Sequence, residues 1–162
     1  MLYAASSPSY ALSVLARDIA TAQGLSLSEN ARAFALIMMG INDSLIASFY
    51  NKYEEIFWRP ETAIRAGALD GNDKTIGDPT FAPLISTPCF PSYPSNHASG
   101  TNGGLEMMRR LFGAAGHDIT FTNHVPALGP MLPDGTPTFP AKTITKHYTQ
   151  LKQIAKDIDD AR

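Results

Sequence analysis

The sequence predicts an all-α fold, a helical bundle of about five helices joined by two long loops. Apolar residues recur at three- and four-residue steps over most of the chain, and the Gly- and Pro-rich stretches between these runs lack such a period. With 162 residues, of which 44% are hydrophobic and 17% charged, the chain is long enough to bury one core. We therefore expect a single helical domain over residues 1–162.

The first half of the chain carries the strongest helical signals. Ser7-Pro8 opens an apolar-periodic run that ends at Gly24. A longer run begins at Ser28 and continues to residue 58. Its apolar stripe consists of Phe34, Ile37, Ile41, Leu45, Phe49 and Ile56. Pro60 then breaks the pattern, because the residue before a proline avoids helical backbone angles, and a short helix follows.

The middle of the chain combines a loop with a third long helix. Residues 70–95 are rich in Gly, Pro, Asp and Thr and predict a long ordered loop, a type of segment that is often functional. Residues 97–112 predict a helix. Gly100, Gly103 and Gly104 weaken its first half, so we expect another backbone or a ligand to come close there.

The end of the chain completes the predicted bundle. Residues 117–143 offer at most a short strand before a second Gly/Pro loop, and residues 142–162 predict a final helix. His117 and His124 lie seven residues apart without cysteine support, which is a poor pattern for a metal site.

Composition and charge limit the partners and the setting of the chain. A net charge of −2 without a run of basic residues argues against nucleic-acid binding. Cys89 is the only cysteine, so the redox compartment stays open. The sequence lacks a basic leader and any run of ~18 uninterrupted apolar residues. We therefore expect a soluble chain without a signal peptide or membrane span; its compartment and any homo-oligomerisation are left open.

Two cations interrupt the apolar stripe of the longest helix. Lys52 lies on this stripe, and Arg59 follows seven residues later, within ~20° of two full turns, so both would leave one face of a continuous helix. Two inward cations need an anion. Alternatively, Lys52 pairs with Glu54 or Glu55 on a solvated surface, and Arg59 caps the helix end.

The segment Ser95-Asn96-His97 lies where the next helix begins. Unpaired backbone N–H groups and the positive end of the helix dipole favour an oxyanion at such a place. The Ser95 hydroxyl adds a donor, and the His97 imidazole can act as a general acid or base near neutral pH. Alternatively, Ser95 is only a helix cap and His97 a first-turn residue.

Together these motifs resemble a known family. Lys52, six residues, Arg59-Pro60, and then Pro94-Ser95-Asn96-His97 resemble the first two signature motifs of the vanadium haloperoxidase and type 2 phosphatidic acid phosphatase superfamily. The flanking stretches FWRPETAIR and PLISTPCFPSYPSNHASG are similar to its soluble haloperoxidase-like branch. The resemblance extends over roughly residues 31–112.

The resemblance implies a role for each motif residue. Lys52 and Arg59 would clamp oxygens of vanadate or phosphate, Ser95 and the Asn96 backbone N–H would donate further bonds, and His97 would be the acid/base. Asn96 stands where the family usually has Gly. Because Asn is the residue that best tolerates left-handed backbone angles after Gly, we expect the turn to be kept and the pocket to be narrower.

The third family motif is an Arg, five residues and a His. Arg162 looks like this Arg and would also bind the oxyanion, while the expected His, the vanadium ligand or phosphoryl acceptor, would lie beyond it. We therefore expect a fragment that lacks the third motif and has no metal ligand of its own.

The resemblance favours one function and leaves two others open. The first is a haloperoxidase that oxidises halide with hydrogen peroxide on a vanadate cofactor. The second is an acid phosphatase that hydrolyses phosphomonoesters without a cofactor. The third is a non-catalytic helical fragment or interaction module. For this chain alone we expect weak oxyanion binding and little turnover, so its standing as an enzyme stays open.

Overall fold

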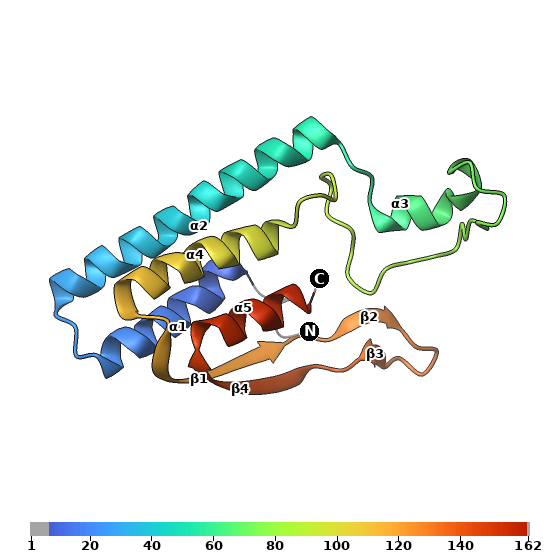
Figure 1. The fold of residues 1–162 in the computed structure, drawn as a ribbon. Helices are drawn as coiled ribbons and strands as arrows, with labels where there is room; N and C mark the ends of the chain where they lie inside the picture. Colours follow the sequence, from blue (N-terminus) through green and yellow to red (C-terminus); the bar gives the residue numbers. More distant parts are fainter. Residues whose placement is uncertain (1–6, 162) are drawn as a thin grey trace.

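The structure is a computed structural model and describes residues 7–161. Four helices lie side by side: α1 (Pro8–Ala22), α2 (Leu27–Glu55), α4 (Asn96–Phe112) and α5 (Leu151–Asp159). The short helix α3 (Pro60–Arg65) and the 3-10 turn η1 (Gly67–Leu69) belong to a segment that extends away from this layer and returns to the start of α4 (Figure 1).

The close packing of α2 against α4 sets the framework of the molecule. A side chain at Gly103 would meet the Ser44 hydroxyl, and its Cβ would lie 2.7 Å from the Gly40 carbonyl oxygen. A Cβ at Gly104 would likewise meet Ile41 at 2.7 Å. The close approach expected at these glycines is therefore that of the α2 backbone and its side chains.

Helix α2 is well defined at both ends. Ser26 and Glu29 form a capping box at its start. It ends at Glu55, where Ile56 adopts a left-handed conformation with φ of 45°, which is uncommon for a β-branched residue. The helix therefore stops short of Arg59, which instead precedes α3 as its N-cap residue.

The segment from α2 to α3 has a membrane-like composition. Leu27–Arg65 is long and apolar enough to cross a membrane by length and composition alone, with a mean hydropathy of 1.4 in its most apolar window. A single stretch of this kind is weak evidence, because core helices of soluble proteins pass the same test. Ser48 and Lys52 are buried on α2 and bond to other parts of the chain.

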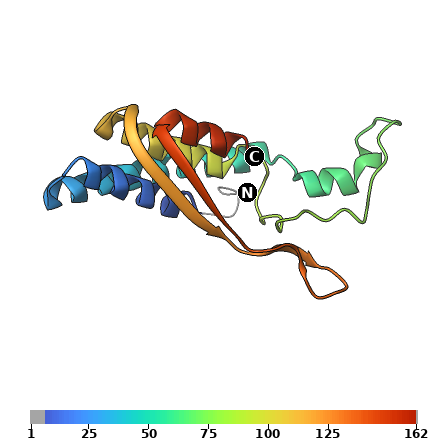
Figure 2. The ribbon, with the colours of Figure 1, turned by 90° about the horizontal axis from the view of Figure 1, so that it is seen from below.

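The all-α prediction is wrong, because two two-stranded antiparallel sheets separate α4 from α5 (Figure 2). Strand β1 (Ala115–Val125) pairs with β4 (Lys142–Gln150), and β2 (Leu128–Met131) pairs with β3 (Pro137–Phe139). Residues 142–150 therefore form a strand, and only Leu151–Asp159 is helical, so the final helix has less than half its expected length.

Side-chain alternation explains these strands. Ile119 and Phe121 are buried while Asp118, Thr120 and Thr122, which alternate with them, are exposed. Tyr148 on β4 stands opposite Ile119. This two-residue period, with β-branched and aromatic side chains, is typical of a strand with one face on a core. That core also contains the inner faces of the neighbouring helices, including Leu12, Leu15, Ile37, Met108, Leu151, Ile154 and Ile158.

We predict that Gly103→Val lowers the free energy of unfolding by about 1–3 kcal/mol, because the new side chain forces α4 away from α2. Urea unfolding followed by circular dichroism measures this change. Arg110→Val serves as a control, since it places the same side chain on the exposed side of α4. Equal stability of the two variants would contradict the described packing.

Candidate functional site

The candidate site begins with a lysine that is almost completely buried. Lys52, on the last turn of α2, has 1% of its surface exposed. Its Nζ donates to the carbonyl oxygens of Pro91 and Ser92, each at 2.8 Å. An ammonium group has three N–H donors, so these two bonds leave one for a further acceptor.

Arg59 contacts the same loop as Lys52. Its Nε donates to the Phe90 carbonyl oxygen at 2.6 Å. Its Nη2 is buried and has no hydrogen-bond partner among the described residues. A buried guanidinium nitrogen without an acceptor is costly, so this atom marks a place for an acceptor atom.

One aromatic ring joins the two cations. The Lys52 Nζ lies 5.2 Å from the centroid of the Phe90 ring, and the Arg59 Cζ lies 4.7 Å from it. Both distances are within the range of cation–π contacts. The backbone N–H of Ser92 also donates to the Phe57 carbonyl oxygen at 2.8 Å, which ties this loop to the chain after α2.

Lys52 and Arg59 are two positive charges without a nearby negative charge from the described residues. Burial, together with the nearby charge of Arg59, lowers the pKa of the Lys52 amine below its usual 10.5, and burial lowers the pKa of Arg59. Within residues 7–161, no ion pair supplies a carboxylate to either cation. The pair therefore lacks a counter-charge from the described part of the chain.

The surface alternative for Lys52 is wrong, because Glu54 and Glu55 are exposed and Lys52 is buried away from them. The two cations would share one helical face only on a continuous helix, and this condition is not met, since α2 ends at Glu55. The loop residue Phe90 brings the two cations together instead.

The start of α4 adds neutral donors next to this pair. Ser95 is the N-cap residue, and its hydroxyl oxygen accepts from the Ala98 N–H at 3.3 Å, as the capping alternative requires. That bond leaves the hydroxyl proton available to a further acceptor. His97 lies half-buried in the first turn of α4.

Asn96 does not adopt the expected left-handed conformation. It is the first residue of α4, and among the described residues Ile56 is the one non-glycine with positive φ. The Asn96 side-chain oxygen instead accepts from the Ser48 hydroxyl at 2.7 Å. Because Ser48 is buried one turn before Lys52 on α2, this bond holds the start of α4 beside the Lys52 end of α2.

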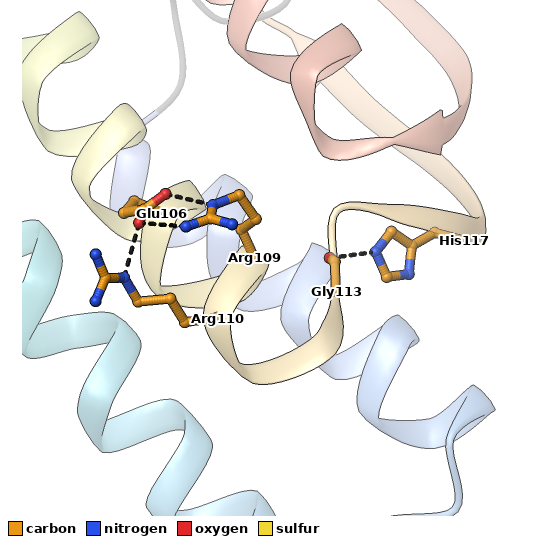
Figure 3. A network of polar contacts seen from close by, with 5 residues as sticks. All are labelled: Glu106, Arg109, Arg110, Gly113 and His117. Atoms are coloured by element: carbon orange, nitrogen blue, oxygen red, sulfur yellow. Dashed lines mark hydrogen bonds and ion pairs between the residues drawn. The ribbon is translucent and has the colours of Figure 1, made fainter.

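The opposite end of α4 carries a separate polar network (Figure 3). Glu106 accepts hydrogen bonds from Arg109 and Arg110, which hold the pKa of Glu106 at about 2. His117 contacts the Gly113 carbonyl oxygen at 2.9 Å. Within residues 7–161, no group of three or more His, Cys, Asp or Glu side chains is arranged to hold a metal ion.

The chemistry of the available donors suits an oxyanion such as vanadate or phosphate. The unpartnered Arg59 Nη2, the remaining Lys52 N–H and the N-terminus of α4 are all donors, and two of them carry positive charge. Arg162, expected to add another donor, lies outside the described residues.

Sequence reasoning missed Phe90 and Ser48. Ser48 lies one turn before Lys52, at helical spacing from Leu45. Its position as a polar residue on the apolar side of the helix could therefore have marked it as a candidate, as it did Lys52. Phe90 is one of three aromatic residues in the loop of residues 70–95, and the spacing of residues shows nothing of its contact with two distant cations.

We predict a pH dependence of stability that Lys52 causes. Its pKa is lower in the folded than in the unfolded chain, so the unfolded chain binds more protons between the lowered value and 10.5. Its contribution to the free energy of unfolding should therefore rise with pH in this window. Urea unfolding between pH 8 and 10.5 should show this rise in the wild type and lose it in Lys52→Met, relative to the exposed-lysine control Lys74→Met. A rise that Lys52→Met retains would contradict the assignment.

Three comparisons place the chain among known proteins. A family model described as the VCPO second helical-bundle domain matches residues 32–162. The vanadium chloroperoxidase of Curvularia inaequalis is 36% identical over 92 residues, which cover 51% of this chain and 14% of the chloroperoxidase. A crystal structure of a bacterial vanadium-dependent iodoperoxidase is similar with a TM-score of 0.67 at 20% identity, over 96% of this chain and 32% of that one.

The two relatives and the family model support different statements. The similarity to the iodoperoxidase shows a shared fold. The chain spans 14% of the length of the chloroperoxidase and 32% of that of the iodoperoxidase. The family model, in contrast, matches most of the chain, including the segments of Lys52, Arg59 and His97. The chain therefore belongs to the family of VCPO second helical-bundle domains, within the vanadium haloperoxidase superfamily.

Proposed function

We propose that this chain supplies an oxyanion site for the oxidation of halide by hydrogen peroxide, as in a vanadium haloperoxidase. The observation that carries the proposal is the pair of cations, Lys52 and Arg59, which has a buried donor without an acceptor and no carboxylate partner within residues 7–161. Family membership supports the same direction.

Each residue of the proposed site has a role that follows from its chemistry. Lys52 and Arg59 would bind and orient oxygens of the anion through charge-assisted hydrogen bonds. Ser95 and the backbone N–H of Asn96 donate to the same anion at the start of α4. His97 gives and takes the protons of the reaction.

Bound vanadate would supply the Lewis-acidic centre at which peroxide becomes able to oxidise halide. In the net reaction, hydrogen peroxide, a halide ion and a proton give hypohalous acid and water. The halide loses two electrons and the peroxide oxygens gain them. In this scheme the proton passes through the His97 imidazole to the departing water.

We predict that the chain binds orthovanadate and phosphate weakly and that Lys52→Ala and Arg59→Ala each reduce the affinity at least about tenfold, because each removes a charge-assisted bond. Isothermal titration calorimetry measures both. Lys74→Ala is the matched control, since this lysine lies exposed on the long loop. Unchanged orthovanadate and phosphate affinity in Lys52→Ala and Arg59→Ala would show that the two cations do not bind the anion.

We further predict that the complete gene product, supplied with vanadate, peroxide and bromide, halogenates a dye, and that His97→Ala lowers its turnover about 100-fold with little change in orthovanadate affinity. Phosphomonoester hydrolysis that vanadate inhibits, without halogenation, would instead establish the acid phosphatase. Absence of both activities, together with absence of anion binding, would establish the non-catalytic module.

A further inference from the structure

We propose that Phe90 is a positioning residue that fixes Lys52 and Arg59 relative to each other. The proposal rests on the function proposed above in so far as the two cations face an oxyanion. It starts from the fact that a single half-buried side chain contacts both cations, at 5.2 Å from the Lys52 Nζ and 4.7 Å from the Arg59 Cζ.

The electrostatics of an aromatic ring suit this role. The face of a phenylalanine ring is negative and its edge positive, so a ring attracts cations to its face without bringing a full negative charge. A carboxylate between Lys52 and Arg59 would neutralise the pair and compete with an incoming anion. The ring offsets part of the repulsion between the two cations and leaves their positive field for a ligand.

Two further contacts orient the ring. Phe49, one turn before Lys52 on α2, meets Phe90 at a centroid distance of 5.2 Å with the planes at 72°, an edge-to-face arrangement. The Phe90 carbonyl oxygen accepts from the Arg59 Nε at 2.6 Å, and the next two carbonyls accept from Lys52. Phe90 therefore contacts both cations with its ring and Arg59 also with its backbone, and its ring packs against Phe49 of the helix that carries Lys52.

A purely structural role for Phe90 makes a different prediction from a positioning role. If the ring only filled space, any apolar side chain of similar volume would serve. If the ring face holds the cations, a ring of the same shape with its charge distribution reversed would fail. Pentafluorophenylalanine at position 90 provides such a ring, and Phe90→Tyr keeps the face as it is.

The experiment compares wild type with Phe90→Leu, Phe90→Tyr and the pentafluorophenylalanine variant. Phe81→Leu is the matched control, since Phe81 is also half-buried in the long loop and its carbonyl also accepts from an arginine Nε, that of Arg65. Its ring has no cation contact among the described residues. Nitrogen-15 NMR measures water exchange of the Lys52 ammonium and Arg59 Nε protons, and calorimetry measures orthovanadate affinity.

We expect exchange at both cations to be about tenfold faster, and orthovanadate affinity about tenfold weaker, in Phe90→Leu and in the pentafluorophenylalanine variant. Phe90→Tyr and Phe81→Leu should stay close to wild type. Wild-type exchange at both cations in the pentafluorophenylalanine variant would overturn the proposal. If the wild type binds no orthovanadate but exchange is still faster in Phe90→Leu and the pentafluorophenylalanine variant, the positioning role is supported and the proposed function is contradicted.

Discussion

Lys52 and Arg59 carry like charges, and holding like charges together in a partly desolvated place requires compensation. The structure provides it with neutral dipoles and one aromatic ring: three consecutive backbone carbonyls, of Phe90, Pro91 and Ser92, and the face of Phe90. The placement of the loop before α4, and with it the start of α4, depends on this arrangement. A bound anion would supply the negative charge that the described residues do not provide to Lys52 and Arg59.

The framework around this pair is built by close helix packing. The glycines of α4 admit α2 at a distance that larger side chains would prevent, and the Ser48 to Asn96 bond joins the two helices near the site. The left-handed Ile56 then turns the chain out of α2, so that Arg59 returns toward the loop from outside the helix. The cations thus converge from two elements.

Sequence patterns predicted α1, α2 and α4 and the inward position of Lys52, because a long apolar stripe and a lysine placed on it are local signals. They failed in part for β1, for which they predict at most a short strand, and fully for β4, for which they predict a helix, although Ile119, Phe121 and Tyr148 follow a two-residue alternation. They also failed for the route by which Arg59 meets Lys52. That route depends on a helix end and on Phe90, which lies far from both residues in sequence, and no local period encodes such a contact.

The acceptors of the Lys52 and Arg59 hydrogen bonds are main-chain carbonyls, which every residue type possesses. Substitutions at Ser92 that preserve the course of the backbone therefore leave these acceptors in place. The insertion or deletion of one residue between Phe90 and Ser95 would shift the carbonyls and the first turn of α4 relative to each other. Natural variation between Phe90 and Ser95 should thus be tolerant of the side chain at Ser92 and strict about length.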